Sequence, residues 1–284
     1  MMRSPRSIFA LSVLALVALT ALLSLVWLPG DPFYADPYRA WENPSPSHPL
    51  GLDGSGRDIL SQLILGSRVT VIVAVGATAV AGVFGAIFAL LGSVGRRWMR
   101  EPVAVLIDVL IAFPTLLIAM MFASVFGGSV WVVVMAVGIG FGVNIGRVMR
   151  AEVMQVARTG YVLSARAIGA SRLSVLTRHI LPNVSAVFIL QLALAMGIAI
   201  LAEAGLSYLG FGAPPSMPSW GRMLAEAQPF LSVHPLTVMW PGLAITLTVL
   251  ASYLLGDALR EALDPNLRMR SNPRKTTTTG VFAR

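Results

Sequence analysis

Long apolar runs separated by short polar segments dominate the pattern of this chain. Crossing a bilayer takes about 17–25 apolar residues in a helix. Six runs that are uncharged or nearly so are that long, and the third and fourth are divided only by the turn signal Gly127-Gly128-Ser129. The pattern predicts an all-α integral membrane protein with six transmembrane helices. The runs are 8–28, 69–94, 102–126, 127–146, 183–202 and 235–256.

The spacing of these runs divides the chain into three parts. Residues 1–65 are predicted to hold an N-terminal transmembrane helix and an extracytoplasmic loop, and 66–268 a core of five transmembrane helices. The first apolar run exceeds the roughly 7–15 residues of a signal-peptide core, so we expect it to stay uncleaved. The polar, basic tail 269–284 is expected to be a disordered cytosolic segment.

Composition agrees with a membrane protein, and the arginines orient it. The chain is 56% hydrophobic and 12% charged, against roughly 25% charged residues in soluble domains. Most of its 21 basic residues fall in segments that lie on one side if the N-terminus is inside. By the positive-inside rule, both termini are predicted to be cytosolic. The net charge of +8 then reflects topology and lipid headgroups. Nucleic acid is not an expected partner, because no basic stripe with interleaved aromatics occurs.

Motifs for chemistry are missing from the sequence. Cysteine is absent, and the three histidines His48, His179 and His234 are predicted on both sides of the membrane, so no single metal site can form. Neither a phosphate-binding G-x-x-x-x-G-K-[ST] loop nor a G-x-S-x-G nucleophile elbow occurs. The glycines 138, 140 and 142 lie inside an apolar run, where close helix packing is the favoured interpretation. We expect no catalytic, cofactor-binding or metal residues, and therefore no enzyme.

Asp108 is read as the only charge well inside a run. An acid in a membrane is costly when unpaired and is a functional hypothesis by default. It lies ~9 Å of helix from the cytosolic end, where Arg96, Arg97 and Arg100 follow the preceding run. Ion pairing or snorkelling is favoured over a proton relay. Pro114 in the same run removes a backbone hydrogen bond and is expected to kink the helix.

The arginine-rich stretch 147–182 is the most informative part of the chain. Val162, Ala165 and Ile168 recur at helical spacing before Gly169, and a second run of Leu173, Leu176 and Ile180 stops at Pro182. The pattern predicts two short helices joined by a glycine bend at the cytosolic membrane surface. An ordinary basic loop that only fixes topology is the alternative.

This stretch resembles the EAA loop of ABC-importer permeases. Ala165, Gly169, Ile180 and Pro182 fall at the family spacing, whereas Leu163 and Ser164 stand where Glu-Ala is usual. The family glutamate is therefore absent here, and no residue at its position can perform its role. In the family this loop docks on a separate ATPase subunit. The resemblance implies ATPase-coupling residues at Ser164, Ala165, Gly169, Ala170, Ile180 and Pro182.

Outer segments extend the resemblance to the dipeptide/oligopeptide/nickel branch of these permeases, in its second, C-type subunit. The segments on which this resemblance rests are HPLGLDGSGRDILSQLILGSR (48–68), AFPTLL (112–117), LSYLGFG (206–212), PSWGRMLAE (218–226) and LLGDALREALDP (254–265). The type I ABC-importer fold is implied. The segment 207–230 is expected to face outside and to fold back toward the pore mouth, with Pro214, Pro218 and Trp220 contacting a binding protein or the substrate path.

The resemblance implies one half of an ATP-driven importer for di- or oligopeptides in the bacterial plasma membrane. The expected partners are a second homologous permease, one or two cytosolic P-loop ATPase subunits, an extracytoplasmic binding protein and membrane lipid. ATP and Mg²⁺ would bind those ATPases and not this chain. Import of a nickel chelate, haem or another small solute by the same fold is the alternative, and a self-contained secondary carrier is a further one.

Overall fold

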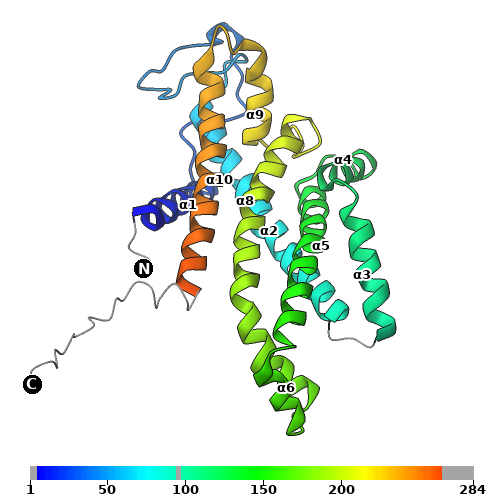
Figure 1. Ribbon diagram of the computed structural model, residues 1–284. Coiled ribbons are helices and arrows are strands. Elements are labelled where there is room, and N and C mark those ends of the chain that lie inside the picture. Colours follow the sequence, from blue (N-terminus) through cyan, green and yellow to red (C-terminus); the bar gives the residue numbers. More distant parts are fainter. Residues whose placement is uncertain (1–4, 94–96, 264–284) are drawn as a thin grey trace, which may run out of the picture.

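The computed structural model describes residues 5–93 and 97–263, and the expected tail 269–284 lies outside them. The regular secondary structure of the described residues is helical. Their only β-pairing is an isolated bridge between Leu52 and Asp58. The helices form an elongated bundle (Figure 1). They are α1 (Pro5–Leu23), α2 (Ile59–Ser93), α3 (Arg97–Ile111), α4 (Thr115–Phe126), α5 (Val130–Val156), α6 (Gly160–Ala167), α7 (Arg172–Val175), α8 (Leu181–Tyr208), α9 (Trp220–Ala227) and α10 (Pro235–Leu263), with a π-helical turn at Leu176–Ile180 and short 3₁₀ turns at Pro37–Arg39 and Gln228–Phe230.

Among the described residues, five helical runs are long and apolar enough to cross a membrane, and a bent pair makes a sixth if it is counted as one span. The all-α membrane fold predicted from the apolar runs is therefore confirmed. The boundaries differ, because α2 begins ten residues before the predicted 69 and α5 continues past 146 to Val156. Polar end turns extend these helices beyond the apolar stretch that marks the bilayer.

The sharpest departure from a straight span is the break between α3 and α4. Proline disfavours helical backbone at the residue before it, and Pro114 stands outside α4 with φ −61° and ψ 122°. The two helices meet at 81°. The kink expected at Pro114 is confirmed, but it is a full break, so 102–126 is not one straight helix.

The centre of the bundle is the contact between α2 and α5, which pack along much of their lengths. A Cβ on Gly138 would lie 2.6 Å from Val80 Cβ, and one on Gly142 would lie 2.7 Å from Phe84 Cβ. Real Cβ atoms do not approach so closely, so these glycines allow the two backbones to meet. Helix packing, the favoured interpretation of this glycine pattern, is confirmed.

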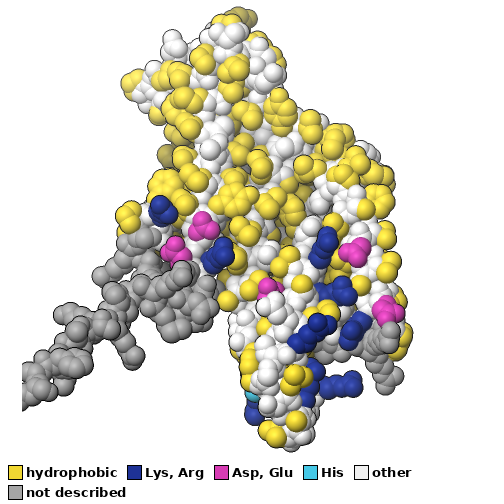
Figure 2. All heavy atoms as spheres, viewed as in Figure 1, with side chains coloured by type: hydrophobic (Ala, Val, Ile, Leu, Met, Phe, Trp, Pro, Cys, Tyr) yellow, Lys and Arg dark blue, Asp and Glu magenta, His cyan; other side chains and the backbone are white. Residues whose placement is uncertain are grey.

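The two ends of the bundle differ in character. The segments predicted to be cytosolic, including α6 and the ends of α5 and α10, lie at one end, and the loop after α1 and helix α9 lie at the other (Figure 1). In the space-filling view, arginine side chains gather toward the α6 end (Figure 2). This separation is what the predicted topology requires.

Candidate functional site

The predicted helix, bend and helix at 160–180 are present, and Gly169 makes the bend. Gly169 N–H donates to Arg166 O at 3.0 Å and Ala170 N–H donates to Ala165 O at 3.1 Å. This is the Schellman arrangement, which needs a left-handed residue after the helix. Gly169 has φ +88°, and a Cβ there would meet nothing within 4 Å. Backbone conformation, and not crowding, therefore requires glycine at this joint.

The second half of this segment does not stop at Pro182, and that expectation is wrong. Leu181 N–H donates to Leu176 O, which closes a π-helical turn directly before α8. Pro182 lies in the first turn of α8, and Asn183 Nδ2 donates to His179 O at 2.6 Å. A proline without N–H is tolerated in a first helical turn. Arg172–Tyr208 therefore forms one helical run of 37 residues.

Half of the predicted docking residues face the interior of the chain. Val162 and Ile180 are buried in an apolar cluster with Val153 and Val184, and Ala170 packs against the same cluster. Ala165 is buried as well. These side chains hold the segment against α5 and α8. They are not available to a partner in this conformation. Of the other three, Ser164 and Pro182 are exposed and Gly169 supplies the bend.

Exposed apolar side chains were missed as docking candidates. Ile168 is 87% exposed and Leu173 is 70% exposed, and both belong to the runs whose helical spacing predicted the two helices. Leu163 is also exposed, and so are the basic residues Arg166, Arg172 and Arg178 of the same segment. We call Leu163, Ile168, Leu173 and these three arginines the coupling surface. Large apolar residues in a strongly basic loop were the available signal.

At the opposite end of α8, a second Schellman arrangement begins the outer cap, residues 209–230. Gly210 has φ +84°, and Phe211 N–H donates to Leu206 O at 2.8 Å. Gly212 follows so close to Ser207 that a Cβ would clash with its hydroxyl. The glycines of LSYLGFG thus turn the chain sharply back onto α8.

A buried carboxylate lies under this turn, and the sequence placed it in a loop. Glu203 is 1% exposed inside α8 and accepts a hydrogen bond from Ser207 Oγ at 2.6 Å. Asp108 is therefore not the only charge in a membrane-length helix. A run of small and apolar residues before Glu203 and glycines after it hid the continuation of the helix.

Trp220 fixes the outer cap to the bundle. Its side chain is 4% exposed, and the indole Nε1 donates to Leu63 O at 2.9 Å. Ser219, also buried, accepts from Arg222 N–H and so caps α9. Pro218 is buried as well, whereas Pro214 is partly exposed and Pro215 and Ser216 are exposed. The indole therefore supports the cap from inside and offers little surface to a partner.

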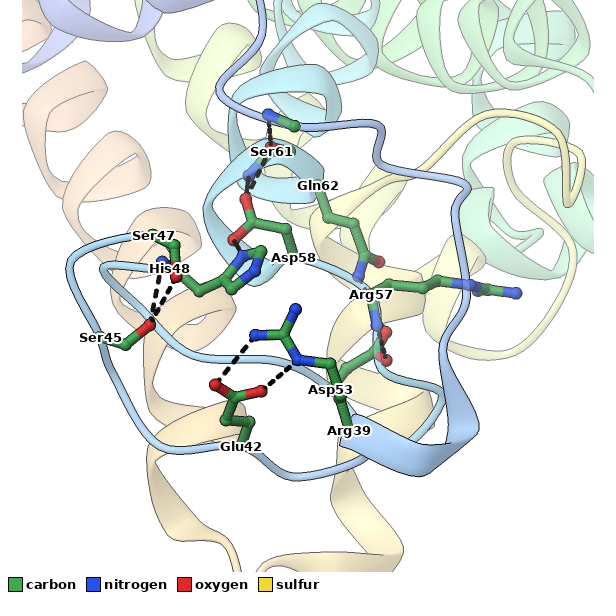
Figure 3. Close-up of polar contacts among 11 residues, drawn as sticks. Arg39, Glu42, Ser45, Ser47, His48, Asp53, Arg57, Asp58, Ser61 and Gln62 are labelled. Carbon is green, nitrogen blue, oxygen red and sulfur yellow. Dashed lines mark hydrogen bonds and ion pairs between the residues drawn. The ribbon is translucent and has the colours of Figure 1, made fainter.

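The loop before α2 is ordered by carboxylates of the HPLGLDGSGRD motif (Figure 3). Asp58 Oδ2 accepts from Ser61 N–H at 2.7 Å and so caps α2, and its Oδ1 lies 3.0 Å from His48 Nδ1. Asp53 accepts from Arg57 N–H and from Gln62 Nε2. These bonds attach the loop to the first turn of α2, next to the outer cap.

A cavity of about 410 Å³ opens between this loop and α9. Its lining includes Trp41, Arg57, Glu226 and Phe230. Trp41 has φ +63°, which is unusual for a bulky residue, and stacks in parallel on His234 with ring centroids 4.2 Å apart. Such a strained residue at an open cavity is typical of contact sites.

Asp108 lies in different surroundings from those expected. It lines a cavity at the α6 end together with Arg147 and Arg150 of α5 and Arg158 of the turn that follows α5. None of the described residues forms an ion pair with Asp108. Arg96, one of its three expected neighbours, lies outside the described residues. The expected ion pair is not found in the described part of the chain.

Comparison with known proteins assigns this architecture to a family. Residues 81–269 match the family described as binding-protein-dependent transport system inner membrane component. The glutathione transport system permease protein GsiD of Pectobacterium atrosepticum is 38% identical over 83% of this chain and 78% of its own length. The dipeptide transport system permease protein DppC of Alkalihalophilus pseudofirmus is 34% identical over 91% of this chain and 86% of its own length.

A solved structure has the same fold. A chain of the MetNI methionine ABC transporter in an inward-facing conformation matches with a TM-score of 0.59 at 15% identity, over 72% of this chain and 96% of that one. At that identity the likeness concerns the fold alone. The family match and the two curated relatives make the assignment: this chain belongs to the binding-protein-dependent transport system inner membrane components, the permeases of ABC importers.

Proposed function

We propose that this chain is one of two permease subunits of an ATP-driven importer for di- or oligopeptides. The observation that carries the proposal is the unbroken helical run Arg172–Tyr208. It joins the bend at Gly169 to the outer cap across the full thickness of the bundle. Relatives named for dipeptide and glutathione transport support the substrate class.

The helical run gives a mechanical account of coupling. Its 37 residues extend ~55 Å at 1.5 Å per residue. A helix of packed residues moves as a rigid element between discrete arrangements. Displacement of α6 and α7 by an ATPase would therefore move Glu203 and the outer cap attached to α8. Inward-open and outward-open states would be biased by nucleotide at one end and loaded binding protein at the other.

The coupling surface indicates what the ATPase must present. Its apolar side chains Leu163, Ile168 and Leu173 require an apolar groove, because they would lose water on docking. Its arginines favour carboxylates at the rim of that groove. The usual family glutamate is replaced here, so docking is expected to depend on these apolar contacts. Ser164 lies on the same exposed face.

At the outer end, the binding protein is expected to contact the exposed rim of the cap around Pro214, Pro215 and Ser216. The neighbouring cavity beside Trp41 and Phe230 offers a second contact. Trp220 and Pro218 would act indirectly by holding the rim in place.

Energy would come from one or two separate ATPase subunits, which would bind ATP and Mg²⁺. The chain itself is proposed to be non-catalytic and to bind no cofactor. A second, homologous permease would complete the translocation path between the two subunits.

Reconstitution of both permeases with the ATPases and binding protein in liposomes tests the proposal. We expect ATP-dependent uptake of labelled di- or oligopeptide, and none without the binding protein. Uptake of a nickel chelate or haem but no peptide would reassign the cargo within the same mechanism. Peptide uptake without ATP would favour a secondary carrier, and ATP hydrolysis by this chain alone would contradict the non-catalytic assignment.

A further inference from the structure

Two cavities at the α6 end of the bundle differ in their balance of charge. The first, of about 230 Å³, is lined by Arg6 and Arg260 together with Asp257 and Glu261, so its charges cancel. The second, of about 650 Å³, lies between α3 and α5 and is lined by three arginines and one acid. Only the second cavity therefore has an excess of positive charge that its own side chains do not neutralise.

The arginines of the second cavity are Arg147, Arg150 and Arg158, and Asp108 is the acid. Arg150 Nε donates to Gly92 O at 3.0 Å, which fixes it to the end of α2. Among the described residues, no carboxylate lies within ion-pair distance of the Arg147 or Arg158 guanidinium. Two guanidiniums with unused donors thus face an open space large enough for a phosphate-bearing group.

The position of this cavity along α5 corresponds to a membrane interface. Measured from Val130 at the outer end, Arg147 lies ~26 Å along α5, and Arg158 follows the last helical residue Val156, which lies ~39 Å along it. A hydrocarbon core is ~30 Å thick and the headgroup layers extend the bilayer to ~40–45 Å. Arg147 therefore stands near the inner edge of the hydrocarbon core, and Arg158 at the far side of the headgroup layer.

The surface of α3 beside the cavity is suited to acyl chains. Val105, Leu106 and Val109 are exposed in the turns around Asp108. Trp98, near the start of α3, is 69% exposed, and exposed tryptophan is enriched at the level of lipid headgroups. An apolar face thus adjoins a basic cavity at the depth where a phospholipid has its glycerol and phosphate.

We propose that the cavity between α3 and α5 binds an anionic phospholipid of the inner leaflet, with its phosphate held by Arg147 and Arg158. Basic pockets between membrane helices on the cytosolic side are a recognised form of lipid-headgroup site. Asp108 limits the excess positive charge and would accept a hydrogen bond from a headgroup hydroxyl. The inference does not depend on which solute the importer carries.

Native mass spectrometry of the purified permease complex tests the site. Delipidated complex is titrated with phosphatidylglycerol, with phosphatidylcholine and with inorganic phosphate. We expect phosphatidylglycerol to bind preferentially, and the double variant Arg147→Gln/Arg158→Gln to lose ~30-fold in affinity, at about fivefold for each arginine near an anionic headgroup. Arg260→Gln, in the charge-balanced cavity, should bind like the wild type. Equal binding by the double variant, or displacement of the lipid by inorganic phosphate, would overturn the proposal.

A second measurement leaves the arginines intact. p-Benzoylphenylalanine at Met154, which also lines the cavity, is irradiated in membranes that contain the assembled complex. An adduct with the mass of an anionic phospholipid supports the site. An adduct to another permease subunit would show that protein covers this cavity, and that result or the lack of a lipid adduct overturns the proposal.

Discussion

The indole of Trp220 donates a hydrogen bond to the backbone carbonyl of Leu63 at 2.9 Å, and so joins residues 157 positions apart in the chain. The bond attaches α9 to α2 close to the loop of the HPLGLDGSGRD motif. Gly66 lies beneath the indole, where a Cβ would come within 2.9 Å of the ring. The outer cap is therefore attached to α2, to whose first turn the loop before α2 is also bonded.

Substitution of Trp220 is expected to destabilise the outer cap, and more so when more of the side chain is removed. Trp220→Ala should lower the free energy of unfolding by ~3–5 kcal/mol, through lost burial and a cavity. Trp220→Phe keeps most of the ring and should cost ~1 kcal/mol for the lost hydrogen bond. Thermal unfolding of the purified complex in detergent measures both. Similar midpoints for Trp220→Ala and the wild type would show that the anchor is dispensable.

Substitutions at Gly169 test whether the bend depends on backbone conformation. Gly169→Asn should retain coupling, because asparagine tolerates positive φ, and Gly169→Val should lose it, because a β-branched residue does not. The open space around this position removes crowding as an explanation. The readout is stimulation of ATP hydrolysis by loaded binding protein at equal membrane abundance. Full stimulation in Gly169→Val would refute the need for a left-handed bend.

The role of the coupling surface can be tested by introducing a charged side chain at its exposed apolar positions. Ile168→Glu and Leu173→Glu should each reduce co-purification of the ATPase subunits, because a charge would enter the proposed apolar groove. Both side chains are mostly exposed, so the fold of this chain should change by no more than ~0.5 kcal/mol.

Leu209→Glu is the matched control, because Leu209 is an exposed leucine at the opposite end of α8. It should leave ATPase co-purification unchanged. Undiminished co-purification of both coupling-surface variants would remove Ile168 and Leu173 from the docking interface.

Topology is accessible to thiol labelling, since the natural chain has no cysteine. Ser216→Cys in the exposed rim should react with an impermeant reagent in intact cells, and Arg172→Cys only after permeabilisation. Ser219→Cys should react poorly from either side, because Ser219 is 0% exposed. Labelling of Arg172→Cys in intact cells would invert the predicted orientation.

The sequence was sufficient for the helices and their bend but not for the faces they present. Apolar runs predicted the membrane helices because a bilayer demands length and hydrophobicity, and Gly169 was predicted because few residues tolerate its conformation. Ile168 and Leu173 were predicted to lie on the two short helices, but helical spacing alone does not distinguish a packed apolar side chain from an exposed one. Glu203 was missed because its burial depends on the cap folding back.

Long-range contacts explain the remaining differences. The role of Trp220 depends on Leu63, and the cavity that Asp108 lines is formed largely by residues of α5. The 81° break at Pro114 exceeds an ordinary proline kink. A single sequence does not show which residues far apart in the chain contact each other.

The π-helical turn at Leu176–Ile180 sets the rotational register between the coupling surface and α8. A π-turn holds one residue more than an α-turn, and one residue corresponds to about 100° of rotation around a helix. Deletion of a single residue in this turn would therefore swing α6 and α7 to a different side of α8 without shortening the membrane span appreciably. If the ATPases dock on the coupling surface as proposed, this one inserted residue sets the side of α8 on which they would lie.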